Sequence, residues 1–153
     1  MALLVSAGLL LLVAGTQGSG PASGEQNLGS HCTNHTIRGT YGIQMEGIGP
    51  VPPPVGGTQT VIGVVKVTYD GMGNFTQIDN IHGSVTGWVP DRPGSGTYQV
   101  NRDCTASTQF SPAPNVFIEQ RMVIVDGGAE LYTITTSPLS SMVTALAKRI
   151  DPR

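Results

Sequence analysis

Few side chains in this sequence could carry out acid–base or nucleophilic chemistry, and none of them stands in a catalytic motif. The three histidines are His31, His35 and His82, and the acidic residues that could partner them are Asp79, Asp91 and Asp103. A nucleophile needs a base beside it and an orienting group behind that base. The chain contains no G-x-S-x-G elbow, no H-E-x-x-H motif and no phosphate-binding glycine loop. We therefore predict no catalytic residue.

Metal binding has no better support in the sequence. Cys32 and Cys104 are isolated from each other, with no C-x-x-C pair, and only His31 and His35 lie near one of them. A structural zinc site takes four Cys or His ligands with short spacings within each pair. We predict neither a metal nor a cofactor.

The candidate residues for binding a small ligand are Trp88, Asp79, His82 and Tyr98. Along the predicted strand 75–85, Asp79 shares a face with Gln77, and His82 shares the other face with Asn80. Polar residues on both faces indicate an edge strand or the wall of a wet cavity, because buried polar groups need partners. Trp88 is either an aromatic residue at the mouth of a ligand cavity or, as the preferred interpretation, one that plugs the end of the fold.

The interior of the fold decides between these interpretations. An open cavity on which the polar groups of strand 75–85 converge would favour ligand binding or catalysis. A filled interior would exclude both, and the residues that would fill it are Val61, Val65, Tyr98, Val123 and Tyr132.

Composition narrows the fold class and the partners. Only 12% of the 153 residues are charged and 5% are aromatic, while 21 are glycine and 11 are proline. This mixture favours many short strands joined by tight turns. The net charge is −2 and the basic residues are scattered, so we expect no nucleic-acid partner, which would select a basic patch.

The first residues resemble a secretory signal. The apolar run 2–15 is shorter than the roughly 20 residues that span a bilayer, and small residues follow it. We predict a signal peptide over 1–22, a flexible lead-in over 23–36, no stable membrane anchor after cleavage, and a secreted or periplasmic location. An uncleaved anchor or a buried helix is the alternative.

Export changes how the two cysteines are interpreted. In an oxidising compartment a pair of cysteines predicts one disulfide, here between Cys32 and Cys104. In the chain-entropy model a bond that closes so long a loop contributes about 4 kcal/mol to the free energy of unfolding.

Alternating apolar and polar residues place the strands. The predicted strands are 37–47, 58–69, 75–85, 97–100, 105–110, 116–125, 130–136 and 142–150. The segments 48–57, 86–96 and 111–115 are rich in Pro or Gly and are predicted to be loops. Turns at 70–74, 101–103 and 126–128, which contain Asp, Asn or Gly, and a turn with Pro138 at 137–141 join the other strands. Eight strands with hairpin spacing predict an all-β fold, a single antiparallel up-and-down β-barrel over 37–150, because closure removes the sheet edges.

Several short motifs resemble one protein family. These are R-G-x-Y-G after Cys32, D-G-x-G-N-F at 70–75, G-x-Y-x-V-x-x-D-C-T at 96–105, and V-D-G-G-x-E-L at 125–131 before a closing A-K-R. They are similar to those of a family of small secreted bacterial proteins with calycin-type or allene-oxide-cyclase-like β-barrels. The resemblance implies such a barrel, and it carries no catalytic residue over to this chain.

Three functions follow as expectations. The first is a non-catalytic exported barrel, a monomer, that binds a small apolar ligand or serves as a structural surface domain. The second is a cyclase- or isomerase-like enzyme that uses the barrel cavity. The third is a protein-interaction module that uses the proline-rich loop 48–57.

Overall fold

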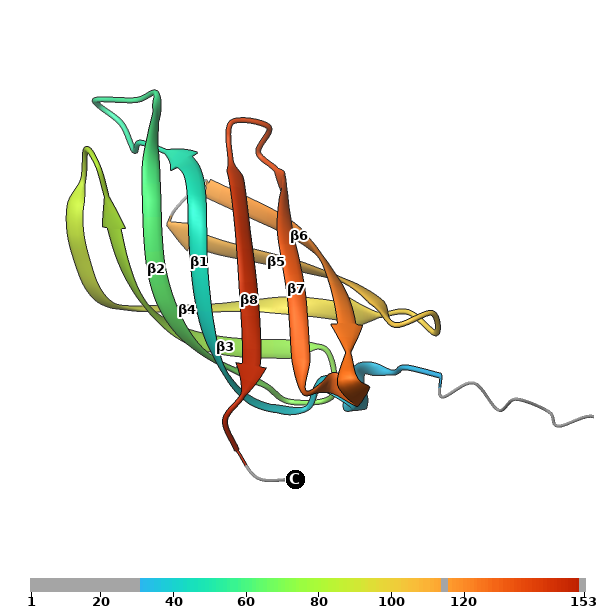
Figure 1. The fold of residues 1–153 in the computed structure, drawn as a ribbon. Coiled ribbons are helices and arrows are strands. Elements are labelled where there is room, and N and C mark those ends of the chain that lie inside the picture. The colour runs from blue at the N-terminus through green and yellow to red at the C-terminus, as the bar shows by residue number, and fades with distance from the viewer. Residues whose placement is uncertain (1–30, 114–115, 152–153) are drawn as a thin grey trace, which may run out of the picture.

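The fold is a closed antiparallel barrel of eight strands, in which each strand pairs with its neighbours in the sequence (Figure 1). The computed structural model describes residues 31–113 and 116–151. Strands β1 and β8 pair with each other and close the barrel. The predicted all-β up-and-down barrel is confirmed. The strands are β1 (Gly39–Pro50), β2 (Thr58–Tyr69), β3 (Asn74–Gly83), β4 (Gly87–Val100), β5 (Thr105–Ala113), β6 (Val116–Val125), β7 (Glu130–Ser137) and β8 (Met142–Arg149).

Strand β2 shows why these sequences form a barrel wall. Its β-branched side chains suit a pleated surface, and Val61, Val65 and Val67 point inward while Val64 and Lys66 point to solvent. Across the register, Val65 lies opposite Ile43 of β1 and Asp79 of β3. Residues that lie opposite one another share a face, so the inward face continues from strand to strand.

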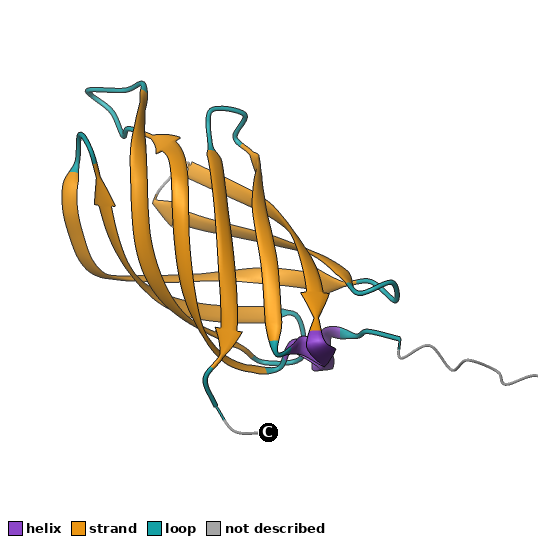
Figure 2. Cartoon of the chain, in the orientation of Figure 1, coloured by secondary structure: helices purple, strands orange, loops and turns teal. Residues whose placement is uncertain are grey.

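Two short 3₁₀ helices lie at one end of the barrel (Figure 2). Helix η1 (Asn34–Ile37) precedes β1, and η2 (Asp126–Gly128) joins β6 to β7. The η2 turn needs positive φ at Gly127 (58°) and Gly128 (88°), which glycine adopts without strain. The predicted lead-in 23–36 thus ends in η1, and the predicted signal peptide 1–22 lies outside the described residues.

The prediction of a loop over 86–96 is wrong, because these residues form the first part of β4. Pro93 lies opposite Ile78 of β3, but β4 pairs with β5 only over Gly96–Val100 within the described residues. A central strand donates N–H groups to both of its neighbours, and a proline has no N–H to donate. The part of β4 before Gly96 is paired with β3 but not with β5, so it accommodates the prolines that suggested a loop.

The other predicted loops were too long. Strand β1 continues to Pro50 and β5 to Ala113, so the loop between β1 and β2 covers only 51–57. The last strand is confirmed as β8 rather than a helix. Within the described residues no helix is long and apolar enough to cross a membrane.

The tightly packed core occupies the end of the barrel that carries η1 and η2, which we call the closed end. Tyr69 contacts the rings of Tyr41, Phe75 and Tyr98 at centroid distances of 5.6, 5.6 and 5.0 Å. Such edge-to-face and tilted pairs stabilise a core beyond the area that they bury. Ile37 of η1 is fully buried in the same cluster, so the helix covers this end of the core.

The predicted disulfide fastens the first described residues to this end. Cys32 and Cys104 are bonded, with their Cα atoms 4.9 Å apart, and the Cys32 amide donates to the Arg102 carbonyl at 3.4 Å. The last described residues also lie here, since the Thr40 amide donates to Asp151 at 3.0 Å. Both ends of the described chain therefore leave the barrel at its closed end (Figure 1).

Candidate functional site

The inward-facing side chains differ in burial between the two halves of the barrel. At the closed end Tyr41, Val67 and Leu131 are buried completely or nearly so. In the other half, Met45 and Ile81 face each other across Gly63, yet each is only half-buried. Because these side chains point inward by strand alternation, their exposed surface faces the interior. We call this half the cup. Its wall combines half-buried and buried side chains, which are Ile43, Met45, Ile81, Val89 and Arg92 in the first group and Val61, Val65 and Asp79 in the second.

Asp79 and Arg92 form an ion pair in the wall of the cup. The Arg92 Nε donates to Asp79 Oδ1 at 2.9 Å and its Nη2 donates to Oδ2 at 3.0 Å, a two-point contact. Gln77 Nε2 also donates to Asp79 Oδ2, at 3.1 Å. The Asp79 side chain is 4% exposed and that of Arg92 is 36% exposed. The guanidinium is therefore the charged group that solvent or a ligand would reach.

This ion pair also has a structural role. Asp79 and Arg92 lie opposite each other on β3 and β4, next to an irregularity in the register between Asp79 and Ile81. The pair links the part of β4 that has no β5 partner to β3. A two-point Arg–carboxylate contact fixes orientation as well as distance, so it holds this half of β4 in the wall.

Another polar pair faces the interior from the neighbouring strands. The Thr108 hydroxyl of β5 donates to Gln120 Oε1 of β6 at 3.0 Å. Together with the Asp79–Arg92 pair, this means that polar side chains of the wall bond to each other. Because these polar groups already have partners in the wall, a ligand inside the barrel does not need to form hydrogen bonds with them.

At the mouth of the cup, Gln59 holds the turn between β3 and β4. Its Oε1 accepts hydrogen bonds from the Val85 amide at 3.0 Å, the Thr86 amide at 2.9 Å and the Thr86 hydroxyl at 3.1 Å. Gln59 is buried, and this turn is therefore fixed to β2 rather than free to close over the cup.

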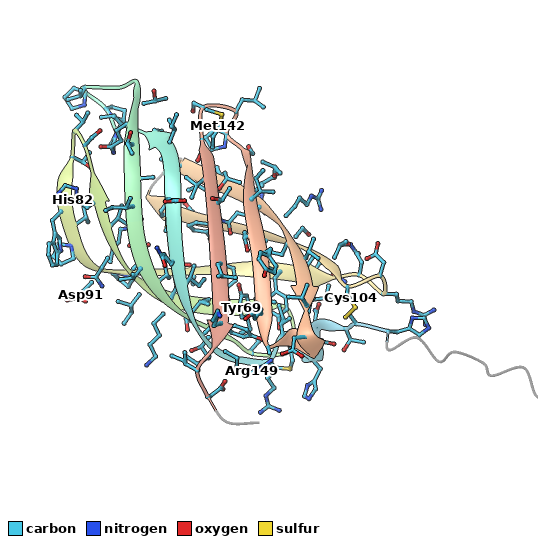
Figure 3. All side chains as sticks on the ribbon, viewed as in Figure 1. Tyr69, His82, Asp91, Cys104, Met142 and Arg149 are labelled. Atoms are coloured by element: carbon cyan, nitrogen blue, oxygen red, sulfur yellow. A yellow bond between two sulfur atoms is a disulfide. The ribbon has the colours of Figure 1, made fainter. Side chains whose placement is uncertain are left out.

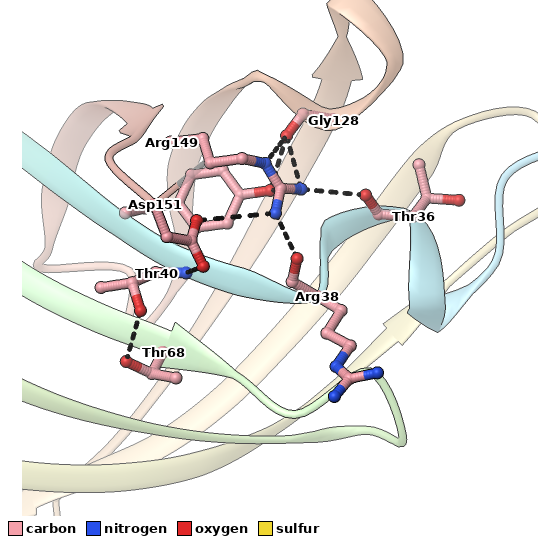
Figure 4. Close-up of polar contacts among 8 residues, drawn as sticks. Thr36, Arg38, Thr40, Thr68, Gly128, Arg149 and Asp151 are labelled. Atoms are coloured by element: carbon pink, nitrogen blue, oxygen red, sulfur yellow. Dashed lines mark hydrogen bonds and ion pairs between the residues drawn. The ribbon is translucent and has the colours of Figure 1, made fainter. Parts of the chain in front are cut away.

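Arg149 closes the opposite end of the barrel (Figure 4). Its Nη2 donates to the Tyr41 hydroxyl at 2.6 Å and to the carbonyls of Gly128 and Thr36 at 3.0 and 3.2 Å. The guanidinium carbon lies 4.8 Å from the centroid of the Tyr41 ring. Arg149 also donates to the Arg38 carbonyl. One side chain thus joins β8, β1, η1 and η2.

The buried tyrosines do not supply a proton-transfer group. Burial raises the pKa of Tyr69 well above its usual value, with the nearby Tyr41 adding to the effect. Burial also raises the pKa of Tyr98, whose hydroxyl donates to the Asn34 carbonyl at 3.1 Å and accepts from the Gly71 amide at 2.8 Å. Both hydroxyls therefore stay protonated near neutral pH and serve as packing and hydrogen-bonding groups.

The structure separates the four residues that the sequence suggested for a ligand site. Asp79 lies in the cup wall, and Tyr98 lies in the core of the closed end. His82 and Trp88 lie opposite each other on β3 and β4, and both are exposed on the outer surface (Figure 3 labels His82). Trp88 therefore does not fill the barrel, because its side chain is 68% exposed.

The sequence does not predict two features of the cup. The predicted loop 86–96 contains Arg92, although counting back in twos from the buried Tyr98 through Gly96 and Gly94 points it inward. The expected filling was also only partly right. Val61 and Val65 do face inward, but Val123 and Tyr132 are exposed on the outer face.

The outer surface carries two grooves over β4 to β7. One, of about 380 Å³, is lined mainly by polar side chains, including Gln99, Gln109 and Arg121. The other, of about 530 Å³, includes the exposed Val123, Tyr132 and Ile134. Among the described residues no cluster of three or more His, Cys, Asp or Glu side chains could hold a metal ion.

Comparison of the chain with protein-family models, with curated proteins and with solved structures finds no match in any of the three. The function of the cup therefore has to be inferred from its geometry.

Proposed function

We propose that this protein is an exported, non-catalytic β-barrel that binds a small, mainly apolar ligand in its cup. One observation carries the proposal. Inward-facing apolar side chains such as Met45, Ile81 and Val89 keep exposed surface in the open half, whereas their counterparts at the closed end are buried. When an apolar ligand covers apolar surface inside the barrel, the free energy falls by about 25 cal/mol for each Å² that is covered.

The size and chemistry of the barrel support a single small ligand. An eight-stranded barrel has room for its own side chains or for one small molecule. Here the closed end is filled by aromatic rings, which leaves the cup. Most of its wall is aliphatic, and Arg92 is the charged group that is accessible. A ligand with an apolar body and one hydrogen-bond acceptor would fit this arrangement.

The proposed location agrees with the disulfide. A bonded Cys32–Cys104 pair is typical of an oxidising compartment outside the cytoplasm. We keep the signal peptide, secretion and the resemblance to calycin-type barrels as parts of this proposal. The eight-stranded up-and-down barrel is compatible with this resemblance, which implies a small β-barrel.

A cyclase- or isomerase-like activity has less support. Such chemistry needs an acid or base free to exchange a proton with the substrate. Asp79 is engaged by Arg92 and Gln77, and His82 points to the outer surface. An interaction module built on the proline-rich loop 51–57 remains the third candidate, and it requires no cup.

The test compares two neighbouring positions on β8. Ala145 faces the cup and Thr144 faces solvent, so Ala145→Phe would fill the cup while Thr144→Phe would not. The probe is 1-anilinonaphthalene-8-sulfonate, an apolar anion whose fluorescence rises in apolar sites. We expect saturable binding to the native protein and to Thr144→Phe, and at least about tenfold weaker binding to Ala145→Phe. Equal binding by the two variants would refute the cup as the site.

Native mass spectrometry of protein purified from its own host is the companion measurement. A single small molecule that remains bound to the native protein and is lost from Ala145→Phe would identify the ligand. Retention of the molecule by Ala145→Phe would place it elsewhere on the protein.

A further inference from the structure

Three turns at the mouth of the cup, 51–57, 84–86 and 138–141, are free of charged residues. Together with the adjoining strand ends, we call them the rim. The stretches 47–65, 83–90 and 131–147, which contain these turns, have no Asp, Glu, Lys, Arg or His. Most turns at the closed end of the barrel carry charged residues, so the absence of charge distinguishes the rim.

The rim presents apolar side chains instead. Leu139, at the turn between β7 and β8, is 95% exposed, and Val55 and Val85 are exposed on the other two turns. Met142 and Trp88 lie exposed on the strands beside them (Figure 3 labels Met142). Singly exposed apolar residues are common, but here they occur on each of three turns at the same end of the barrel.

The closed end shows the opposite pattern. Its turns carry Asp70, Arg102, Asp103 and Asp126, and Arg38 precedes β1. Charged and ionisable residues of the described chain therefore lie at the closed end or along the wall, including His82, which lies opposite Trp88. The molecule is polarised along the barrel axis in charge as well as in packing.

The backbone of the rim is also suited to a poorly hydrated setting. The amides of Val85 and Thr86 donate to Gln59, and that of Ser84 donates to Thr60, so every N–H of the turn 84–86 has a protein partner. Pro52, Pro53 and Pro54 have no N–H at all, and the Val51 amide donates to the Gly57 carbonyl at 2.9 Å. Removing these groups from water therefore breaks few hydrogen bonds.

From these observations we propose that the rim docks onto the surface of an uncharged lipid bilayer, with the mouth of the cup facing the lipid. Hydrocarbon excludes charged side chains, and Trp is favoured at the boundary between lipid and water. The rim has no basic cluster that would select anionic lipid, so the attraction is apolar rather than electrostatic. Docking is peripheral, through loop tips, and the closed end stays in water.

This inference extends the proposed function but does not depend on it. If the cup binds an apolar ligand, docking would let that ligand pass between bilayer and cup without crossing water. If the cup binds nothing, the rim still has the surface of a lipid-docking site. The vesicle experiment therefore tests the docking proposal, and the probe experiment tests the cup independently of it.

The experiment uses Trp88, the only tryptophan of the chain, as its own reporter. The purified protein is titrated with phosphatidylcholine vesicles, and we expect a blue shift of its emission together with flotation of protein with the vesicles. Leu139→Asp should weaken the partitioning about tenfold or more, because it removes apolar surface and adds a charge at the contact.

The matched control is Met72→Asp. Met72 is an apolar side chain at a turn of the closed end, and at 81% exposed it resembles Leu139 in being apolar and highly exposed on a turn. We expect Met72→Asp to bind vesicles like the native protein, at low and at high salt. Both variants keep the same N-terminus, so any residual apolar segment there affects them equally.

Three results would overturn the proposal. The first is an unshifted Trp88 emission at millimolar lipid. The second is equal vesicle binding by Leu139→Asp and Met72→Asp. The third is a dimer of the native protein that Leu139→Asp dissociates while vesicles bind neither, because the rim would then be an interface between two copies of the chain.

Discussion

The two ends of this barrel are built from different kinds of residues. At the closed end aromatic rings, a disulfide and the Arg149 network join the first and last strands to both short helices. At the rim the three turns are uncharged, their tips are apolar, and some inward-facing side chains below them, such as Met45 and Ile81, are only half-buried. At one end polar side chains such as Arg149 and Tyr41 are bonded within the protein, and at the other apolar side chains such as Leu139 and Val55 are exposed.

This difference separates stability from binding. The disulfide, the aromatic cluster and the Arg149 network, which bridge distant parts of the chain, all lie at the closed end. Uncovered apolar surface costs free energy in the isolated protein, and a binding site keeps it because a partner covers it. Substitutions at the two ends should therefore affect different measurements.

The largest effect should come from the disulfide. Replacing Cys32 and Cys104 by Ala removes a cross-link with a sequence separation of 72 and should lower the free energy of unfolding by about 4 kcal/mol. Urea unfolding of the double variant and of the native protein measures the difference, and vesicle and probe binding should persist under folding conditions. Two reactive thiols in the untreated native protein would contradict the premise.

Arg149 should come next. Arg149→Met leaves the Gly128 and Thr36 carbonyls without this donor and should cost about 3 kcal/mol. Arg149→Lys should recover only part of this, because an ammonium group cannot contact several fixed acceptors as a planar guanidinium does. Thermal unfolding of the two variants provides the measurement, and full recovery by Lys would show that charge alone matters.

The Asp79–Arg92 pair tests the boundary between the two ends. Arg92→Leu leaves the buried Asp79 carboxylate uncompensated and should cost about 2 kcal/mol, whereas Asp79→Leu should cost about 1 kcal/mol because Arg92 is partly exposed and already reaches water. Replacing both by Leu should be nearly neutral. Equal costs for the two single variants would show that the carboxylate is as well hydrated as the guanidinium.

The smallest effect should be at the turn 70–74. Asp70 accepts hydrogen bonds from the Asn74 side chain and from the amides of Asn74, Met72 and Gly73, and these lower its pKa to about 2. The folded pKa is below the unfolded value of about 3.9. Its stabilising contribution is therefore complete above pH 4 and is lost as the pH falls towards 2.

Asp70→Asn isolates this contribution, since Asn keeps the turn-forming oxygen and removes the charge. The urea midpoints of the native protein and the variant should differ slightly at pH 7 and converge towards pH 2. A difference that stays constant over this range would show that the charge of Asp70 does not contribute.

The sequence was sufficient for the architecture because its signals are local. The alternation of β2 and the Asp-Gly turn at 70–74 depend on neighbouring residues only, and the two cysteines had one possible pairing within the chain. The upper part of β4 was missed because Pro90 and Pro93 normally exclude a strand. Their tolerance here depends on a strand that is unpaired on one side, which only the three-dimensional register reveals.

The site was harder to predict because it depends on contacts between strands. Asp79 meets Arg92 only through the register between β3 and β4, and a shift of one residue would turn Arg92 outward. The Arg149 network is similarly nonlocal, since Tyr41, Thr36 and Gly128 are brought to it by three different segments. The uncharged rim is the exception, because the stretches 47–65, 83–90 and 131–147 can be identified in the sequence once the turns are known.

The positions of the two chain ends have a practical consequence for orientation. Cys32 and Asp151, near the ends of the described chain, both lie at the closed end, on the side away from the rim. A fusion partner, an affinity tag or a chemical linker attached to either end would therefore hold the barrel by its base. Molecules immobilised in this way would all present the mouth of the cup outward, which makes the chain suitable for display on a sensor surface.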